Sequence, residues 1–424
     1  MADGTPSRAL GALRHRNYRL FFTGQIVSTV GTWMQSVAMP WLALELTHSG
    51  FFVGLVLAAQ FTPILVGGQF GGIVADRFPK RNVLLATQTA FTVPPFVLFL
   101  LTASGHAQYW MVILAALSAG IINVFDVPAR QAFIVEMVGK KDLTNAIALN
   151  SSVFNAAAVI GPSIAGVVIA FAGVPLCFLA NSISYLAAVG ALLLMRDLPR
   201  REPVIHQERF FARLAEGAAY ARRTPVVGGL LLTVASFSLF AMNRSTLLPL
   251  FADQVLNVGA QGFGFMLAAM GLGAVCGALT LAFFPEMGAN PRRQLWVAAI
   301  WAAALLEFAL SRVFVLSLVT LFVAGYCQIS FLATSNSRLQ IITPDHLRGR
   351  VMALYMQAFA GVSPIGNLQA GLLASLFGAP WSMAIGAIMA AASLLGISVA
   401  IPEVFSADRG EAAARDSSTT WLRS

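Results

Sequence analysis

Long segments without a charged residue constrain this chain more than any other feature of its sequence. A hydrocarbon core about 30 Å thick takes about 20 apolar helical residues to cross, and charged residues are only 11% of this chain. The segments do not alternate in polarity, as the strands of an outer-membrane barrel do. The pattern therefore excludes both an ordinary soluble enzyme and such a barrel. The charge-free segments span residues 20–44, 49–75, 82–125, 143–195, 254–285, 313–337 and 351–402.

Turn residues divide the longest of these segments into pairs of helices. The breaks fall at residues 102–108, 172–175 and 378–380, where glycine and proline favour turns. The fold class expected is an all-α membrane protein with twelve transmembrane helices. These helices are predicted near residues 18–44, 50–75, 82–103, 109–129, 144–171, 176–196, 225–251, 260–284, 294–311, 314–338, 348–376 and 381–401.

Lysines and arginines predict the orientation of these helices. Cytoplasmic loops carry an excess of basic residues. Numbering the loops alternately places all but Arg244 and Arg312 of the 27 basic residues, Arg338 included, on one side. Both termini are therefore expected in the cytoplasm, for a multi-pass protein of the inner membrane. The net charge of +9 fits a collar facing anionic lipid, so the lipid bilayer is an expected partner and nucleic acid is not.

A polar stretch near residues 196–224 divides the predicted helices into two sets of six. Within it, residues 209–223 place apolar side chains at helical spacing against arginines, which predicts an amphipathic helix on the membrane surface. Pro162 and Pro364 lie inside apolar spans of the two halves, where proline bends a helix. Repeated halves with bent helices are typical of rocking transporters. The predicted domains are a six-helix bundle (1–196), a cytoplasmic linker (197–224), a second six-helix bundle (225–401) and a cytoplasmic tail (402–424).

Two sets of charges fall inside predicted membrane spans, where charges are usually functional. Asp126 and Arg130 lie four residues apart on one helix. They are predicted to form a structural pair at the inner mouth, or Asp126 to carry a proton. Arg244 is predicted to bind an anionic group, to pair with Glu307 or Asp253, or to extend to the membrane surface.

A polar stripe follows one face of the first predicted helix, because Gln25, Thr29, Thr32 and Gln35 recur at helical spacing together with Ser28 and Ser36. The stripe either lines a substrate cavity or forms hydrogen bonds between helices, each worth about 0.6 kcal/mol. The substrate contacts would otherwise be mostly apolar. Further polar candidates inside the spans are Asn123, Asn150, Asn155, Asn243, Gln328 and Gln357.

Several patterns are absent from the sequence. No carboxylate or histidine falls at the middle of a predicted span, which favours neutral, zwitterionic or anionic amphiphiles over strongly cationic substrates. The motifs G-x-S-x-G and H-E-x-x-H and a P-loop are also absent. Cys177, Cys276 and Cys327 fall in three separate predicted helices, where buried packing is expected instead of a disulfide or a metal site. We therefore expect no enzyme activity, no metal and no cofactor.

Two motifs carry a family resemblance. Residues 72–81 (GIVADRFPKR) resemble the loop signature G-x-x-x-D-R-x-G-R-R/K of the major facilitator superfamily, with proline at its second glycine. Residues 157–166 (AAVIGPSIAG) resemble the antiporter motif G-x-x-x-G-P-x-x-G-G, with alanine at two glycines. Over residues 10 to 401 the chain is similar to the branch that contains enterobactin exporters and macrolide efflux proteins. Segments 13–22 (LRHRNYRLFF), 31–35 (GTWMQ), 127–133 (VPARQAF) and 348–352 (RGRVM) also fit that branch.

The resemblance implies which residues control the conformational change. Asp76 at a helix C-terminus needs a partner, because the helix dipole disfavours a carboxylate there. The family implies that this partner is Arg77 with the N-terminus of the helix near 348, and Gly72 would let these helices approach. The alternatives are that the basic residues only set topology and that the small residues near 161 serve ordinary packing. The implied gating residues are Gly72, Asp76, Arg77, Lys80, Arg81, Gly161, Pro162, Gly166, Arg348 and Arg350.

The function expected from the residues and the resemblance together is secondary export of small amphiphilic molecules by alternating access. The expected substrate is of drug or siderophore type, protons are the expected coupling ion through antiport, and a monomer is expected. The alternatives are an importer, a lipid transporter or a facilitator of the same fold.

Overall fold

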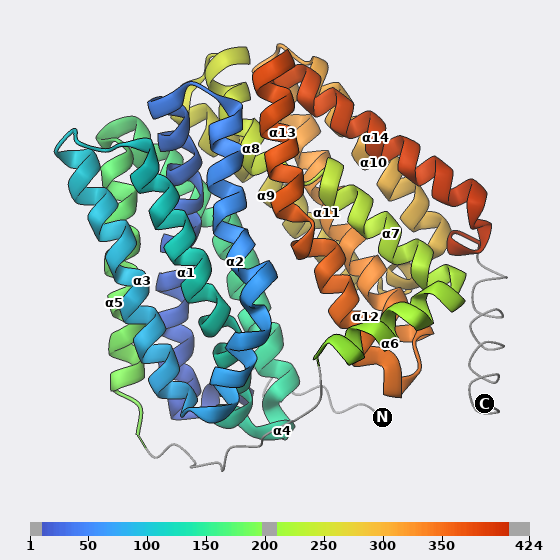
Figure 1. Ribbon diagram of the computed structural model, residues 1–424, viewed down its shortest axis with the longest axis horizontal. Coiled ribbons are helices and arrows are strands. Elements are labelled where there is room, and N and C mark those ends of the chain that lie inside the picture. The colour runs from blue at the N-terminus through green and yellow to red at the C-terminus, as the bar shows by residue number, and fades with distance from the viewer. Residues whose placement is uncertain (1–10, 197–209, 407–424) are drawn as a thin grey trace. The chain divides into compact units, whose positions relative to one another are not determined.

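The computed structural model describes residues 11–196 and 210–406, which form helices and turns without a strand (Figure 1). The chain separates into two compact units. The first unit contains Met1–Thr47 and Ala59–His206, and the second contains His48–Ala58 and Gln207–Ser424. Parts of the predicted linker (197–209) and of the predicted tail (407–424) lie outside the described residues.

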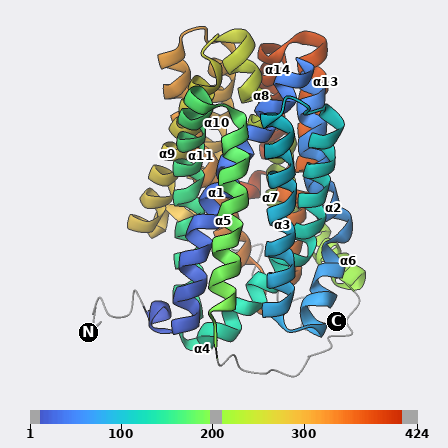
Figure 2. The same cartoon turned by 90° about the vertical axis from the view of Figure 1, so that its left-hand side faces the viewer.

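Five long helices form most of the described part of the first unit, although the first residues of the second helix, up to Ala58, belong to the second unit. Figure 2 shows α5 beside α1 and α3, both of which it contacts. Helix α4 covers two of the predicted spans, which meet at Gly139, where φ is +68°. Glycine adopts this backbone region without a steric penalty, so the direction of the chain changes there. The helices are α1 (Arg16–Thr47), α2 (Gly50–Arg77), α3 (Lys80–Ala103), α4 (Tyr109–Ala172) and α5 (Val174–Leu193), after a short turn at Gly11–Arg14.

Aromatic and aliphatic side chains fill one end of the first unit. Phe21 of α1 meets Phe133 of α4 edge to face, with ring centroids 6.0 Å apart. Leu84 and Leu192 are buried in the same cluster. The Tyr18 hydroxyl donates to the carbonyl of Ala146, 2.9 Å away, so its polar atom is satisfied inside this core.

The described residues of the second unit form nine complete helices, and two of the predicted spans in it are broken. The span predicted at 225–251 is interrupted by a turn at residues 241–243, and the span predicted at 348–376 by a π turn at Gln357–Gly361. The helices are α6 (Phe210–Arg223), α7 (Pro225–Phe240), α8 (Arg244–Leu250), α9 (Gly259–Phe283), α10 (Pro291–Leu310), α11 (Phe314–Ile342), α12 (Asp345–Met356), α13 (Ser363–Phe377) and α14 (Ala379–Ala400). Short turns lie at Phe251–Val255, Pro285–Ala289 and Pro402–Val404.

An arginine lies inside the second unit. Arg338 of α11 is only 5% exposed, although the topology argument placed it among the cytoplasmic loops. Its Nη1 donates to Gln294 Oε1 at 2.5 Å and its Nη2 to the Val404 carbonyl at 2.6 Å. These acceptors satisfy a buried guanidinium, which spacing along the sequence does not reveal.

Nine helical spans among the described residues are long and apolar enough to cross a membrane. Two belong to α4, one joins α7 with α8, and the others are α3, α5, α9, α10, α11 and α14. Helix α1 is not among these spans because its polar stripe lowers its mean hydropathy. The α12–α13 segment is not among them because the π turn divides it into two shorter helices. Twelve crossings, and cytoplasmic termini, stay predictions.

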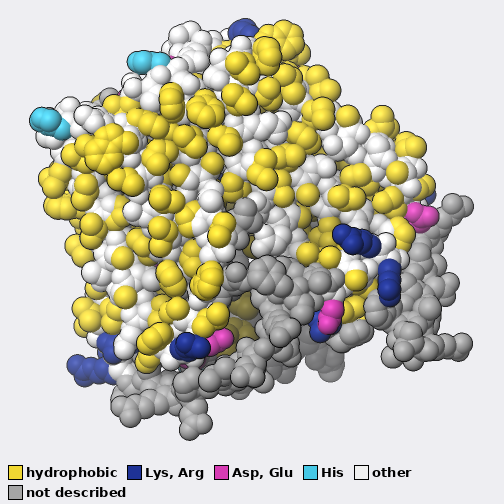
Figure 3. Space-filling model, in the orientation of Figure 1, with side chains coloured by type: hydrophobic (Ala, Val, Ile, Leu, Met, Phe, Trp, Pro, Cys, Tyr) yellow, Lys and Arg dark blue, Asp and Glu magenta, His cyan; other side chains and the backbone are white. Residues whose placement is uncertain are grey.

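Hydrophobic side chains, coloured yellow, cover most of the face drawn in Figure 3. Phe171, Phe283 and Val399 are all largely exposed on long helices, as expected of side chains that face lipid. Cys276 is also exposed, contrary to the expectation of burial, whereas Cys177 and Cys327 are buried. A thiol on α9 therefore lies at the surface of the second unit.

Candidate functional site

A buried carboxylate on α4 is the centre of the polar site in the first unit. Asp126 is 1% exposed. Its Oδ2 accepts a hydrogen bond from Arg130 Nε at 3.0 Å, and the Arg130 Nη2 is also in contact. The pairing of these two residues, four apart on one helix, is confirmed. A buried charge is tolerated only when it is paired and hydrogen-bonded.

Two residues of α3 complete the environment of this carboxylate. Thr87 Oγ1 and Gln88 Nε2 donate to Asp126 Oδ1 at 2.8 and 2.7 Å. The sequence reasoning missed both residues, although they are polar side chains inside an uncharged span. Four donors from Thr87, Gln88 and Arg130 therefore converge on the Asp126 carboxylate.

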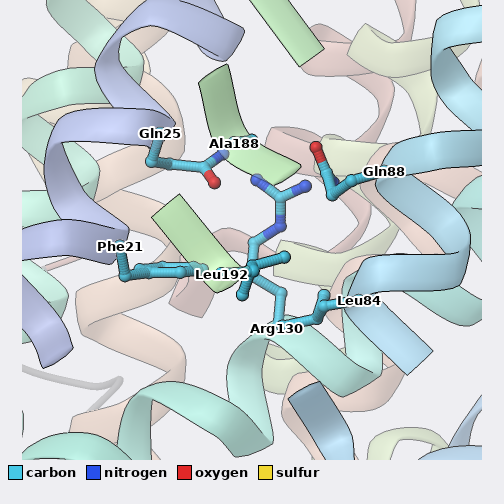
Figure 4. Close-up of a pocket in the computed structure, with 7 residues that line it drawn as sticks. All are labelled: Phe21, Gln25, Leu84, Gln88, Arg130, Ala188 and Leu192. Carbon is cyan, nitrogen blue, oxygen red and sulfur yellow. The ribbon is translucent and has the colours of Figure 1, made fainter. Parts of the chain in front are cut away.

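A small cavity adjoins Arg130. Figure 4 shows the Arg130 guanidinium directed between Gln25 of α1 and Gln88 of α3. The cavity has a volume of about 10 Å³, which is about the space that one water requires. Phe21, Leu84, Ala188 and Leu192 form its apolar walls. Gln25 of the predicted stripe therefore faces this site.

Other members of the α1 stripe bind the neighbouring helix α5. Thr32 Oγ1 and the Tyr185 hydroxyl are 3.1 Å apart, and Asn181 Nδ2 donates to Gln35 Oε1 at 2.5 Å. The sequence left open whether the stripe lines a cavity or joins helices. Gln25 lines a cavity, whereas Thr32 and Gln35 join α1 to α5. Thr29 is buried and accepts a hydrogen bond from Gln25 Nε2 at 3.3 Å.

A second polar cluster lies where two broken helices meet in the second unit. Ser238, near the end of α7, donates to the Phe359 carbonyl of the π turn at 2.5 Å. Thr246 of α8 donates to Asn367 Oδ1 of α13 at 3.0 Å. Asn243, in the break itself, is buried and its Nδ2 donates to the carbonyl of Leu239 at 2.8 Å. These side chains satisfy backbone groups that a break releases within an apolar span.

Arg244 begins α8 beside this cluster and is half-buried. Glu307 and Asp253, the two predicted partners, are both exposed. Arg244 forms an ion pair with neither of them, nor with any other carboxylate in the part of the chain that the structure describes. The predicted pairing is therefore wrong, and a cation without a carboxylate partner adjoins a polar helix break.

The remaining polar candidates occupy less informative positions. Asn123 binds its own helix, with Nδ2 donating to the Ala119 carbonyl at 3.0 Å. Gln357 is half-buried at the start of the π turn. Asn155 lies on α4, and its side chain is outside the described part of the structure.

The basic residues of segment 72–81 join helix ends in the first unit. Lys80 Nζ lies 3.3 Å from Glu136 Oε1 of α4. Arg81 donates to the carbonyls of Leu192 and Leu193 at the end of α5, at 2.9 and 3.1 Å. A cation at this place also opposes the negative end of the helix dipole. Asp76 and Arg77 are exposed at the end of α2.

The approach of Gly72 to the helix near residue 348 stays a prediction, and within the first unit the close contact of α2 with α4 is at Gly71. A Cβ on Gly71 would lie 1.7 Å from the Val124 carbonyl oxygen of α4, whereas a Cβ on Gly72 would meet no atom within 4 Å. In the second motif, a Cβ on Gly161 would lie 2.5 Å from Trp33 Cβ of α1, and Pro162 and Gly166 are buried. The second motif therefore packs tightly against α1.

The two predicted arginines of α12 have separate partners. Arg350 Nη1 lies 2.5 Å from Glu216 Oε2 of α6, and Arg348 Nε donates to the Gln340 carbonyl at 3.1 Å. The Arg350 contact ties the amphipathic helix to α12. Sequence spacing could not identify it, because the partner lies on a different element.

A family described as transmembrane secretion effector matches residues 7–421. The chain belongs to this family of major facilitator transporters. The resemblance seen in the sequence is thereby confirmed, and the protein is a multi-pass transporter of the inner membrane and not an enzyme.

Curated relatives cover most of the chain. A staphyloferrin A transporter of Staphylococcus aureus is 25% identical over 397 residues, which are 91% of this chain and 95% of that protein. The enterobactin exporter EntS of Shigella flexneri is 28% identical over 343 residues, or 80% of this chain and 81% of that protein.

Solved structures share the fold at low identity. A bacterial homologue of the human lysosomal transporter Spinster, in an inward-facing and unoccupied conformation, has a TM-score of 0.70 at 13% identity. It matches 97% of this chain and 98% of its own. A POT family transporter in complex with a thioalcohol-conjugated peptide has a TM-score of 0.73 at 12% identity, over 92% and 97%. These similarities establish the helical transporter fold.

Proposed function

We propose that this transporter exports small amphiphilic molecules of drug or siderophore type by alternating access, in exchange for protons. The observation that carries the proposal is the buried Asp126–Arg130 pair, surrounded by Thr87, Gln88 and Gln25. A charge pair inside an apolar span costs free energy, so such pairs are usually functional. Secretion in the family description and the name of the enterobactin exporter support the outward direction.

Asp126 is the proton acceptor in this proposal. A proton that binds Oδ2 neutralises the carboxylate and removes most of its attraction for Arg130. The guanidinium, which already lines the small cavity beside Gln25, then presents its donors to an anionic or polar group of the substrate. Loss of the proton restores the pair. When Asp126 is deprotonated, its carboxylate pairs with Arg130, and when Asp126 is protonated, the substrate does so. Export of the substrate is thereby coupled to the protonation of Asp126.

Everted membrane vesicles test both parts of the proposal. Vesicles acidified by respiration and loaded with a pH-sensitive dye receive macrolides, siderophores and dyes one at a time. Release of protons on addition of one compound is expected for the unaltered protein and not for Asp126→Asn. The matched control is Asp142→Asn, because Asp142 is a partly exposed carboxylate of the same helix that pairs with His15.

The outcomes separate the alternatives. Proton release that persists in Asp126→Asn would remove Asp126 from the pathway. Accumulation of a compound without proton release would favour a facilitator, and uptake in the opposite direction would favour an importer. Lipid movement without any response to the soluble compounds would favour a lipid transporter.

A further inference from the structure

A large cavity lies in the second unit, apart from both polar clusters. Its volume is about 490 Å³, within the range of about 300–1,000 Å³ that is usual for small-molecule sites. Ala218 and Ala221 of α6, Ala235 of α7 and Leu354 of α12 contribute to its walls. The amphipathic helix thus covers a hollow between itself and the bundle.

The lining of this cavity is almost entirely apolar. Arg222, at the end of α6, is the only charged residue among those that line it in the described part of the chain. It is exposed, so its guanidinium reaches solvent or headgroups while the walls beneath it are hydrocarbon. A sugar or nucleotide would leave its polar groups unpaired on such walls. The chemistry instead fits a long apolar chain that ends in an anion.

The position of the cavity indicates where such a molecule comes from. Leu232 lines it, is 56% exposed, and belongs to α7, a helix apolar enough to cross the membrane. We therefore expect the open side of the cavity to meet the acyl chains of the bilayer. Figure 3 shows basic side chains among hydrophobic ones over the end of α6 and the start of α7. Basic amphipathic helices lie at the level of the headgroups and attract anionic lipid.

We propose that this cavity binds one acyl chain of an anionic phospholipid from the surrounding bilayer, whose headgroup phosphate contacts Arg222. The acyl chain fills the space between α6 and the helices beneath it, and its contacts hold α6 against α7 and α12. The Arg350–Glu216 ion pair fixes the other side of α6 to α12. The proposal does not depend on the substrate or direction of transport.

Native mass spectrometry of the full-length protein tests this proposal. The protein is stripped of lipid in detergent and then mixed with dioleoylphosphatidylglycerol or dioleoylphosphatidylcholine. One retained phosphatidylglycerol is expected, with about fivefold lower occupancy by phosphatidylcholine, whose zwitterionic headgroup has no net charge, as one basic residue near an anionic headgroup provides. Arg222→Gln should lower phosphatidylglycerol to the level of phosphatidylcholine. The matched control is Arg223→Gln, since Arg223 is adjacent and exposed but does not line the cavity.

Variants that fill the cavity test the acyl chain. Ala235→Phe should lower the occupancy of both lipids about tenfold, because the inserted ring competes for the same space. Ala218→Phe does the same from α6, outside the membrane spans, and remains informative if Ala235→Phe fails to fold. Equal lipid binding by these variants and the unaltered protein would overturn the proposal, as would equal loss in Arg222→Gln and Arg223→Gln. Displacement of the lipid by soluble glycerol phosphate would also overturn it, because the headgroup alone would then be the ligand.

Discussion

The two polar clusters differ in how they treat charge. In the first unit, Asp126 and Arg130 neutralise each other, and further side chains satisfy the carboxylate. In the second unit, Arg244 begins a helix after a break and has no carboxylate partner among the described residues. A neutralised pair suits a group that exchanges a proton, whereas a cation without an acid suits an anionic ligand. The two units therefore differ in the chemistry that each offers.

The largest effect is expected from removing one charge of the neutralised pair. Asp126→Asn leaves the Arg130 guanidinium buried without a counter-charge, which should lower the free energy of unfolding by about 3–5 kcal/mol. The double variant Asp126→Leu/Arg130→Met replaces both charges with apolar groups and should recover most of that loss, but not transport. Thermal unfolding in detergent measures both. A double variant as unstable as Asp126→Asn would mean that the hydrogen bonds from α3, and not the charges, determine the stability.

The packing of the first unit provides the next largest effect. Gly71→Ala should lower the free energy of unfolding by about 1–3 kcal/mol, because the added Cβ meets the Val124 carbonyl. Gly72→Ala is the matched control and should change it by less than about 0.5 kcal/mol. Thermal unfolding of the two variants side by side checks the pair. Equal losses would place the contact between α2 and α4 elsewhere.

The unpaired cation of the second unit should affect affinity more than stability. Arg244→Gln should weaken the transport of an anionic substrate about tenfold, the lower end of what a hydrogen bond to a charged group provides. The unfolding temperature should stay nearly unchanged, because no ion pair is lost. Concentration dependence of transport measures the effect, with Arg312→Gln as an exposed control. An unaltered affinity would remove Arg244 from the substrate pathway and leave the contrast between the units without a functional meaning.

The smallest effect is expected at the surface of the second unit. Glu216→Gln removes the partner of Arg350, but the carboxylate is largely exposed. Solvent-exposed pairs contribute about 0.2–1 kcal/mol. The free energy of global unfolding should therefore change little. Hydrogen exchange of the α6 backbone amides should become faster, because the helix loses its ion pair with α12. Unchanged exchange would show that apolar packing alone holds α6.

Helix positions and the family were predictable from the sequence because both depend on local patterns. The charge-free segments predicted where the helices lie, and the loop signature together with the Gly161–Pro162 motif predicted the family. The Asp126–Arg130 pair was predictable for the same reason, since residues four apart on a helix lie on the same face.

Contacts between elements were not predictable in the same way. Periodicity assigns a side chain to a helix face but does not say which neighbour covers that face. Thr87 and Gln88 were missed for this reason, and so was the contact of Gly71 with α4. Arg338 was counted among the loop residues although it lies within α11, because a basic residue near a helix end resembles a loop residue until its acceptors are known.

The Arg338 contact has a consequence for where the polypeptide can be cut. Its guanidinium donates to the Val404 carbonyl, beyond the last long helix α14. The short turn at Pro402–Val404 is therefore an integral part of the second unit's interior. Truncation after Ala400 would strand a buried cation, whereas a purification tag or fluorescent fusion joined after Ser406 leaves that acceptor in place.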